Sequence, residues 1–157
     1  MTRLTIPMPL RWGDQDAYGH VNNATMFRLL EEARIRAFIL DEGGSGQSPI
    51  AALPASPSAQ IWTLIGGQQI EYLRPVPYLR DPLRIELWLG HLGGASIDIC
   101  YEVKSPAGVQ PEVTYARALT TLVLVDADTG LPRRLDSELR ALWEPYLEAP
   151  IAFRKRG

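Results

Sequence analysis

The chain has one cysteine, two histidines and two lysines among its 157 residues. A single cysteine, Cys100, cannot form a disulfide within the chain, and with two scattered histidines it offers no metal-ligand spacing. No apolar stretch approaches the roughly 20 residues that a membrane-spanning helix requires. The N-terminus also lacks the apolar core of a signal peptide. We therefore expect a cytoplasmic protein with no metal site and no membrane partner.

Positive charge is not in excess either. The formal net charge is -2, so the chain lacks the global basic field that nucleic-acid-binding proteins use. We expect no nucleic-acid partner. Nearly all basic residues are arginines, which suit two-pronged contacts with phosphates or carboxylates. A compositional bias of the source genome explains this excess more simply.

What the chain does contain fits one globular α+β domain over residues 1–157. Hydrophobic residues make up 46% of the sequence and charged residues 22%. Apolar residues alternate with polar ones from Leu4 to Trp12, which predicts a strand. Apolar spacing of three and four predicts a long helix from Ala24 to about Leu40, with Asn22 or Asn23 as its N-cap and with Gly43 and Gly44 at its end. Further strands are predicted at residues 61–73, 83–89, 97–103 and 113–125, with a short helix at 136–147. Gly66 and Gly67 predict a bulge or a close approach within the first of these strands.

Two segments outside these elements have loop character. Residues 43–60 are rich in Gly, Ser, Pro and Ala and predict a long loop, with a short helical turn around Ile50 to Leu53. Residues 148–157 form a tail whose basic end, from Phe153 onward, we expect to be frayed.

The order of these elements favours one antiparallel sheet of about five strands around one long helix. Hairpin-length turns join most of the strands, as an antiparallel meander requires. Such a sheet leaves an open edge and an apolar face, and dimerisation would cover both.

The stretch from Trp12 to Asn23 concentrates polar groups at the junction between the first strand and the helix. A carboxylate here, above all Asp16, could act as a nucleophile or as a base that activates water. The first amides of a helix have no partner within it and carry partial positive charge, so the amides leading to Asn23 could hold an oxyanion. The same residues allow a structural interpretation, in which Asp16 caps a turn and the helix start is an ordinary one.

A family resemblance rests on this stretch and on later segments. The sequence resembles the hotdog-fold acyl-CoA thioesterases of the 4-hydroxybenzoyl-CoA thioesterase type over roughly residues 3–146. The motifs are Asp14 to Asn23, Phe27 to Arg34, Gln69 to Pro75, Asp81 to Leu87, and the Asp126–Gly130 turn with Pro132. The resemblance implies a hotdog fold, a homodimer or homotetramer, and sites shared between two subunits.

The resemblance also implies roles for single residues. Asp16 matches the family's catalytic aspartate, and the backbone N–H of Asn23 matches its oxyanion donor. Gly19 would let the backbone approach the substrate. In an extended segment Asp14 would point to the same face as Asp16, which makes it a second candidate, but we expect it to order the loop. His20 could act as a base, but we expect it to support the site by packing or hydrogen bonding. CoA carries phosphates, so an arginine such as Arg74 is expected at the pocket rim; Arg80 and Arg117 are alternatives.

The expected function is therefore hydrolysis of an acyl-CoA thioester to a free acid and CoA, without a cofactor. Two other functions stay open. A hydratase or dehydratase of the same fold would act on acyl thioesters through a paired histidine and carboxylate, and only His20 is near Asp16 in the sequence. A binding module without catalysis would hold the acyl thioester and not turn it over.

Overall fold

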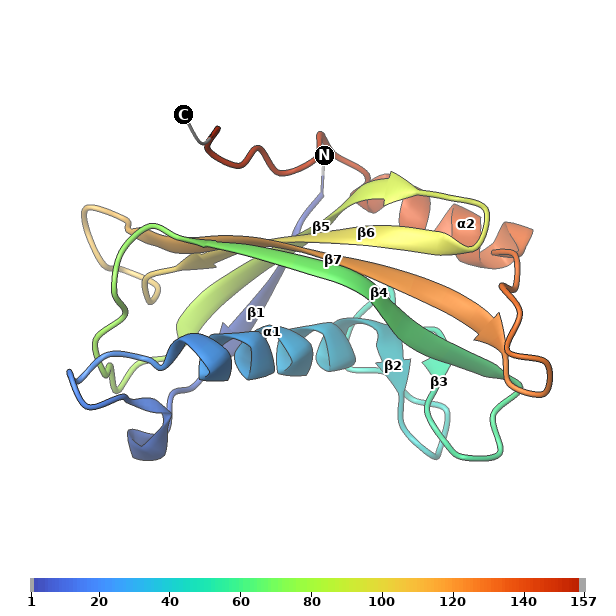
Figure 1. Cartoon of the computed structure of the whole chain (residues 1–157), viewed down its shortest axis with the longest axis horizontal. Helices are drawn as coiled ribbons and strands as arrows, with labels where there is room; N and C mark the ends of the chain where they lie inside the picture. The colour runs from blue at the N-terminus through green and yellow to red at the C-terminus, as the bar shows by residue number, and fades with distance from the viewer. Residues whose placement is uncertain (1, 156–157) are drawn as a thin grey trace.

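A five-stranded antiparallel sheet dominates the computed structural model, which describes residues 2–155. The strands lie in the order β1-β5-β6-β7-β4 (Figure 1). The sequence located all five. Alternation predicted β1, β5 and β6, whose side chains are buried largely at every second position against the inner side of the sheet. Their bounds are β1 (Leu4–Met8), β4 (Ile61–Tyr72), β5 (Leu83–Leu92), β6 (Ser96–Lys104) and β7 (Thr114–Asp126).

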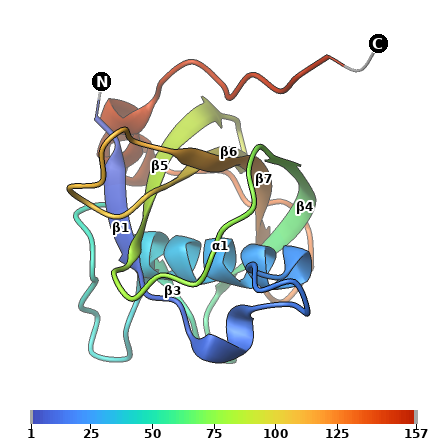
Figure 2. The ribbon, with the colours of Figure 1, turned by 90° about the vertical axis from the view of Figure 1, so that its left-hand side faces the viewer.

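Helix α1 (Asn23–Phe38) packs beneath the inner face of this sheet (Figure 2). Its apolar stripe is buried, as the three-and-four spacing predicts, and consists of Met26, Leu29, Leu30, Ala33, Ala37 and Phe38. The helix has 16 residues and is thus about 24 Å long. The 13 residues of β7 extend about 40 Å. The expectation of one long central helix is therefore met only in part, since other segments must cover the rest of the sheet.

The chain leaves α1 earlier than its glycines predict. Ile39 is already extended, and β2 (Ile39–Leu40) pairs in parallel with β3 (Leu53–Pro54). The prediction that Gly43 and Gly44 end the helix was therefore wrong. The helical turn predicted around residues 50–53 was also wrong, because that segment is a turn followed by β3.

The C-terminal end of α1 is closed by the second helix, α2 (Ser137–Trp143), which continues as the 3₁₀ helix η2 (Glu144–Tyr146). The Trp143 ring is fully buried and meets Phe38 edge to face, with 5.4 Å between ring centroids. The Trp143 indole N–H donates to the carbonyl of Ile50 at 2.9 Å. Part of the predicted loop is thus a core element that covers the sheet where α1 stops.

The outer face of the sheet carries the C-terminal segment, residues 147–154, which crosses it from β5 towards β4 (Figure 2). The Glu148 N–H donates to the carbonyl of Leu89 at 2.9 Å, and the Trp88 indole donates to the carbonyl of Ala149 at 3.0 Å. At the far end, the Arg154 N–H donates to the Glu71 carboxylate at 2.8 Å. The expected fraying from Phe153 thus does not hold at Arg154; residues 156–157 lie outside the described residues.

Strand β4 forms an open edge of the sheet, because only β7 pairs with it. The register shifts between Ile65 and Gly67, which places the predicted bulge at Gly66. Trp62, Leu64 and Ile65 on this strand are 45%, 51% and 44% exposed.

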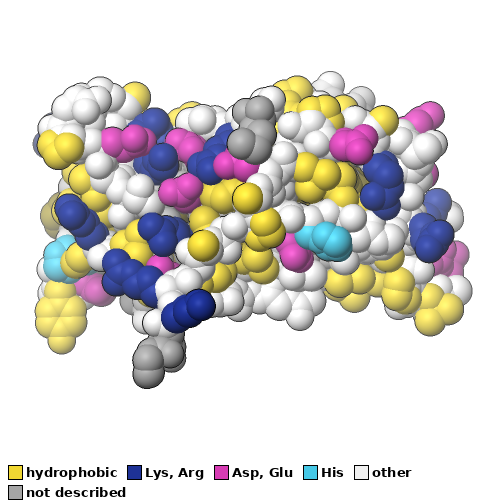
Figure 3. Space-filling model, turned by 90° about the horizontal axis from the view of Figure 1, so that it is seen from above, with side chains coloured by type: hydrophobic (Ala, Val, Ile, Leu, Met, Phe, Trp, Pro, Cys, Tyr) yellow, Lys and Arg dark blue, Asp and Glu magenta, His cyan; other side chains and the backbone are white. Residues whose placement is uncertain are grey.

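Seen from outside the sheet, apolar side chains alternate with charged groups over the surface (Figure 3). Within residues 2–155, neither helix combines the length and hydropathy of a membrane span.

Candidate active site

The loop before α1 folds back on itself through backbone hydrogen bonds. It opens with the 3₁₀ helix η1 (Trp12–Asp14). The Asp16 N–H then donates to the carbonyl of His20 at 2.7 Å, and the Gly19 N–H donates to the carbonyl of Asp16 at 3.2 Å. Gly19 has φ of +78°, a conformation that glycine adopts without a steric penalty. The glycine therefore makes this tight reversal possible.

The two oxygens of the Asp16 carboxylate differ in their hydrogen bonding. Oδ1 accepts the backbone N–H groups of Tyr18 at 2.8 Å and His20 at 3.2 Å. No hydrogen bond from residues 2–155 reaches Oδ2. The turn-capping interpretation and the catalytic one are thus compatible, because one oxygen fixes the side chain while the other is available to a ligand.

Asp14 lies in η1, where its side chain is 2% exposed. Its carboxylate accepts the backbone N–H of Arg11 at 2.7 Å and the Arg11 guanidinium at 3.1 Å. Its carbonyl accepts the N–H of Asn22 at 2.9 Å. Asp14 therefore does not stand beside Asp16 on one face of an extended segment; it connects the start of the loop to the helix cap.

The N-terminus of α1 is capped by Asn22, one of the two asparagines predicted for this position. Asn22 Oδ1 accepts the N–H groups of Ala24 at 2.9 Å and Thr25 at 3.2 Å. The Met26 N–H donates to the Asn22 carbonyl at 3.0 Å. The Asn23 N–H has no acceptor among the described residues. It is a free donor at the positive end of the helix dipole.

His20 is half-buried beside these groups. Its backbone bonds to Asp16 and forms an isolated bridge to Pro77. Its imidazole makes no hydrogen bond to any described residue. The histidine therefore holds the loop through its main chain, and the structure does not pair its ring with the Asp16 carboxylate.

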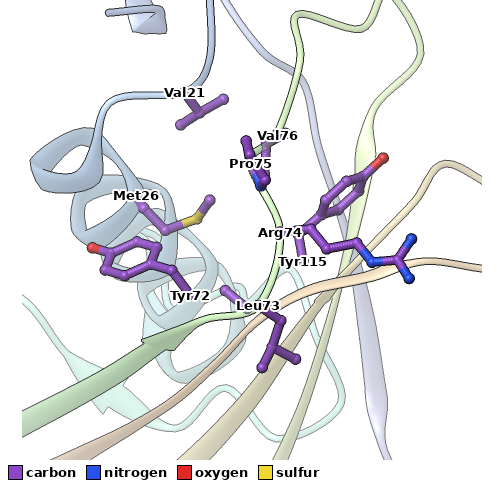
Figure 4. A pocket seen from close by; sticks show the side chains of 9 residues that line it. Val21, Met26, Tyr72, Leu73, Arg74, Pro75, Val76 and Tyr115 are labelled. Carbon is purple, nitrogen blue, oxygen red and sulfur yellow. The ribbon is translucent and has the colours of Figure 1, made fainter.

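A cavity of about 230 Å³ lies beside the helix N-terminus (Figure 4). Its walls come from the loop, from α1, from the end of β4 with its connector, and from β7. They are mostly apolar: Val21, Met26, Tyr72, Leu73, Arg74, Pro75, Val76, Tyr115 and Ala116. The Arg74 guanidinium points away from Met26 and Tyr72 (Figure 4). The Arg74 guanidinium thus lies outside the apolar part of the cavity, where it could contact a polar group of a ligand.

Tyr72 belongs to the candidate site, and sequence reasoning missed it. It faces the inner side of β4, where its register partner is Ala116, and its O–H donates to the carbonyl of Asn23 at 2.8 Å. Alternation along β4 places Tyr72 on the same face as Ile70, which could have indicated the inward position. The contact with Asn23, 49 residues away, left no signal in the sequence.

The described residues offer no obvious metal centre. Within residues 2–155, no group of three or more His, Cys, Asp or Glu side chains is arranged to hold a metal ion.

Burial raises the pKa of the Tyr72 phenol, which therefore stays protonated at neutral pH. Tyr72 thus connects the cavity wall to Asn23 through its hydrogen bond, whereas Asp16 and Asn23 do not themselves line the cavity.

Comparisons with known proteins agree on the fold. The PA2801 protein of Pseudomonas aeruginosa, a candidate thioesterase, is 28% identical, with a TM-score of 0.69 over 87% of this chain and 95% of its own. An aspartate-to-asparagine mutant of 4-hydroxybenzoyl-CoA thioesterase, solved with 4-hydroxybenzoyl-CoA, is 19% identical, with a TM-score of 0.71 over 90% of this chain and 98% of its own. These likenesses show the hotdog-like thioesterase fold.

A curated relative is less informative about activity. The uncharacterized protein YsmA of Bacillus subtilis is 32% identical over 93 residues, which are 59% of this chain. The match spans about half of that relative, 54% of its length. The model of the Thioesterase-like superfamily, in contrast, matches residues 10–143 and so takes in the loop, the helix and all of the sheet except β1. By that match, the chain belongs to the Thioesterase-like superfamily.

Proposed function

We propose that this protein is an acyl-CoA thioesterase, which hydrolyses the thioester of an acyl-CoA to a free carboxylic acid and CoA. One observation carries the proposal. Two groups have no hydrogen-bond partner among residues 2–155: a carboxylate oxygen in the loop that leads into α1, Asp16 Oδ2, and an amide at the start of that helix, the Asn23 N–H. A negative group that can attack, close in sequence to a positive group that can hold an oxyanion, is what thioester cleavage needs.

The roles follow from this chemistry. The Asn23 N–H, helped by the helix dipole, holds the negative oxygen that forms on the carbonyl carbon. Asp16 attacks that carbon directly, or it takes a proton from water, whose oxygen then attacks. On the first route the C–S bond breaks, CoA leaves as a thiolate, and water then hydrolyses the mixed anhydride, which releases the acid and restores Asp16. On the second route the water oxygen forms the new C–O bond, the C–S bond breaks, and the proton held by Asp16 passes to the CoA thiolate. Gly19 gives the loop its shape, and Asp14 and His20 support it through the contacts described above.

The cavity and Arg74 support an acyl-CoA ligand in particular. The apolar walls between Met26 and Tyr115 suit the acyl group. Arg74 is exposed and turned outward, where a CoA phosphate would pair with it. The solved 4-hydroxybenzoyl-CoA complex on the same fold supports this ligand class.

The open edge of β4 supports assembly as a homodimer, or as a homotetramer built from dimers. Trp62, Leu64 and Ile65 expose apolar surface along an edge with unpaired backbone groups. Tyr72, which lines the cavity, lies on the same strand and is 46% exposed. A second copy seated on this edge would therefore border the cavity. Light scattering of the purified protein tests the assembly, and a monomer at working concentration would contradict it.

The test of function is thiol release from a panel of short, long and aromatic acyl-CoA esters. Wild type should hydrolyse at least one of them, and Asp16→Asn should lower kcat about 100-fold or more, because the amide can neither attack nor take a proton. Asp128→Asn is the matched control, since Asp128 is exposed in the turn after β7. Unchanged turnover in Asp16→Asn would remove Asp16 from the mechanism.

The same panel separates the two rival functions. A hydratase or dehydratase would change the absorbance of an enoyl-CoA without releasing thiol. A binding module would show a ligand-induced rise in Tm without turnover of any ester. The cytoplasmic location expected from the sequence stays a prediction.

A further inference from the structure

Tyr72 joins two elements that no other hydrogen bond connects. Its O–H donates to the Asn23 carbonyl at 2.8 Å, from the last residue of β4 to the first residue of α1. Among residues 2–155 this is the one hydrogen bond between that strand and that helix. The phenol therefore links the helix N-terminus to the strand that borders the cavity.

Asn23 is held on both sides. On the side of the loop, the Asn22 N–H donates to the Asp14 carbonyl at 2.9 Å, and Asn22 Oδ1 receives the next two amides of the helix. On the side of the sheet, Tyr72 holds the Asn23 carbonyl. Between these anchors the Asn23 N–H has no acceptor of its own. Its direction is set by its neighbours and not by a hydrogen bond that a ligand would have to break.

We propose that Tyr72 is a positioning residue for thioester hydrolysis: it fixes Asn23 so that the backbone N–H points at the oxyanion. This inference rests on the proposed function. Tyr72 acts through Asn23, and its ring also forms part of the cavity wall beside Met26 (Figure 4). A phenol with its ordinary pKa is already protonated and a donor across the neutral range, and burial raises the pKa of Tyr72 further.

The expected effect lies on kcat. An oxyanion donor binds the transition state more tightly than the ground state, so a misdirected donor slows turnover and leaves substrate binding nearly intact. Complete loss of one such donor costs about 100- to 1,000-fold in kcat. Loss of the Tyr72 hydroxyl leaves the Asn23 N–H in place but less well directed. We therefore expect kcat to fall about 5- to 20-fold, which is less than for complete loss of the donor.

Tyr72→Phe is the variant that isolates the hydroxyl, because it keeps the ring in the cavity wall. We expect kcat to fall by that factor, with KM within about 2-fold of wild type. The backbone amide resonance of Asn23 in a ¹H–¹⁵N spectrum should shift in the variant. Tyr146→Phe is the control, since Tyr146 is half-buried in η2 and its hydroxyl has no hydrogen bond among the described residues.

The outcomes separate the two proposals. If wild type is active, Asp16→Asn is inactive and Tyr72→Phe has wild-type kcat, the positioning role is wrong and the proposed function stands. A raised KM with unchanged kcat would make Tyr72 only a wall of the cavity, which also overturns the inference. If wild type hydrolyses no acyl-CoA, the proposed function fails, and the Asn23 resonance still reports whether Tyr72 orients that amide.

Discussion

The two ends of α1 use their polar groups in opposite ways. At the C-terminal end, the Ser48 hydroxyl donates to the Ala37 carbonyl at 2.6 Å, and the Ala52 N–H donates to the Phe38 carbonyl at 3.0 Å. Trp143 then closes this end with its buried ring. Carbonyls that the helix cannot satisfy internally thus find partners in the protein.

The N-terminal end is capped by Asn22, but it leaves two groups without a partner in the described chain, the Asn23 N–H and Asp16 Oδ2. A cavity lies beside this end. Asn23 is exposed and Asp16 is half-buried, so a ligand can reach both groups. Under the proposed function, one end of the helix serves stability and the other serves binding, and substitutions should separate the two.

The largest effect on stability is expected from Trp143→Ala at the C-terminal end. Loss of a fully buried ring should lower the free energy of unfolding by about 3–5 kcal/mol, as measured by urea denaturation. Trp143→Phe, which loses the hydrogen bond to Ile50, should cost about 1–2 kcal/mol. For either variant, kcat per folded molecule should equal that of wild type. A folded variant with impaired kcat would show that the two ends are coupled and would break the comparison.

Asn22→Ala at the N-terminal end should have a smaller effect on stability, and it should also lower activity. Loss of the cap should cost about 1 kcal/mol of unfolding free energy, and kcat should fall because Asn22 also fixes its neighbour Asn23. Asp136→Ala is the matched control, because Asp136 caps α2 through the N–H of Leu139 at 2.8 Å. It should lose similar stability and keep its kcat. Equal kcat values for the two variants would argue against a functional N-terminus.

How far the sequence predicts each end depends on how local the contacts are. The cap at Asn22, the apolar stripe of α1 and the strands follow from spacing and from neighbours within a few residues. The C-terminal end did not follow: Gly43 and Gly44 resemble a helix stop, but pairing of Ile39 with Leu53 ends the helix first. A preference for a local conformation is weak and yields to such long-range pairing.

The candidate site divides in the same way. The sequence indicates Asp16 and the amides that lead to Asn23 as candidates, because they lie in one continuous motif. It does not indicate which oxygen of Asp16 is free or that Tyr72 reaches Asn23, because both depend on how distant segments pack. The C-terminal segment escaped prediction for the same reason, since its partners lie on β5 and β4.

The outer face of the sheet sharpens the comparison, because it stabilises the fold without touching either end of α1. There the Arg3 guanidinium lies 3.8 Å from the Trp88 ring centroid, and it donates to Glu148 at 2.9 Å as well as to Glu86 and Glu102. Hydrogen bonding to Arg3 lowers the pKa of Glu148 below its ordinary value. The carboxylate therefore stabilises the fold above its unfolded-state pKa, and this contribution is lost as the pH falls through the lower folded-state pKa.

The smallest effect is thus expected from Glu148→Gln. At pH 7 the free energy of unfolding of the variant should be about 1 kcal/mol below that of wild type. The loss is small because Arg3 keeps its ion pairs with two other carboxylates. The gap should narrow as the pH falls from about 5 to 3, where the wild-type carboxylate takes up its proton. Urea denaturation at pH 7, 5, 4 and 3 measures it, and kcat at pH 7 should not change. A gap that stays constant with pH would mean that Glu148 holds the C-terminal segment by packing and not by its charge.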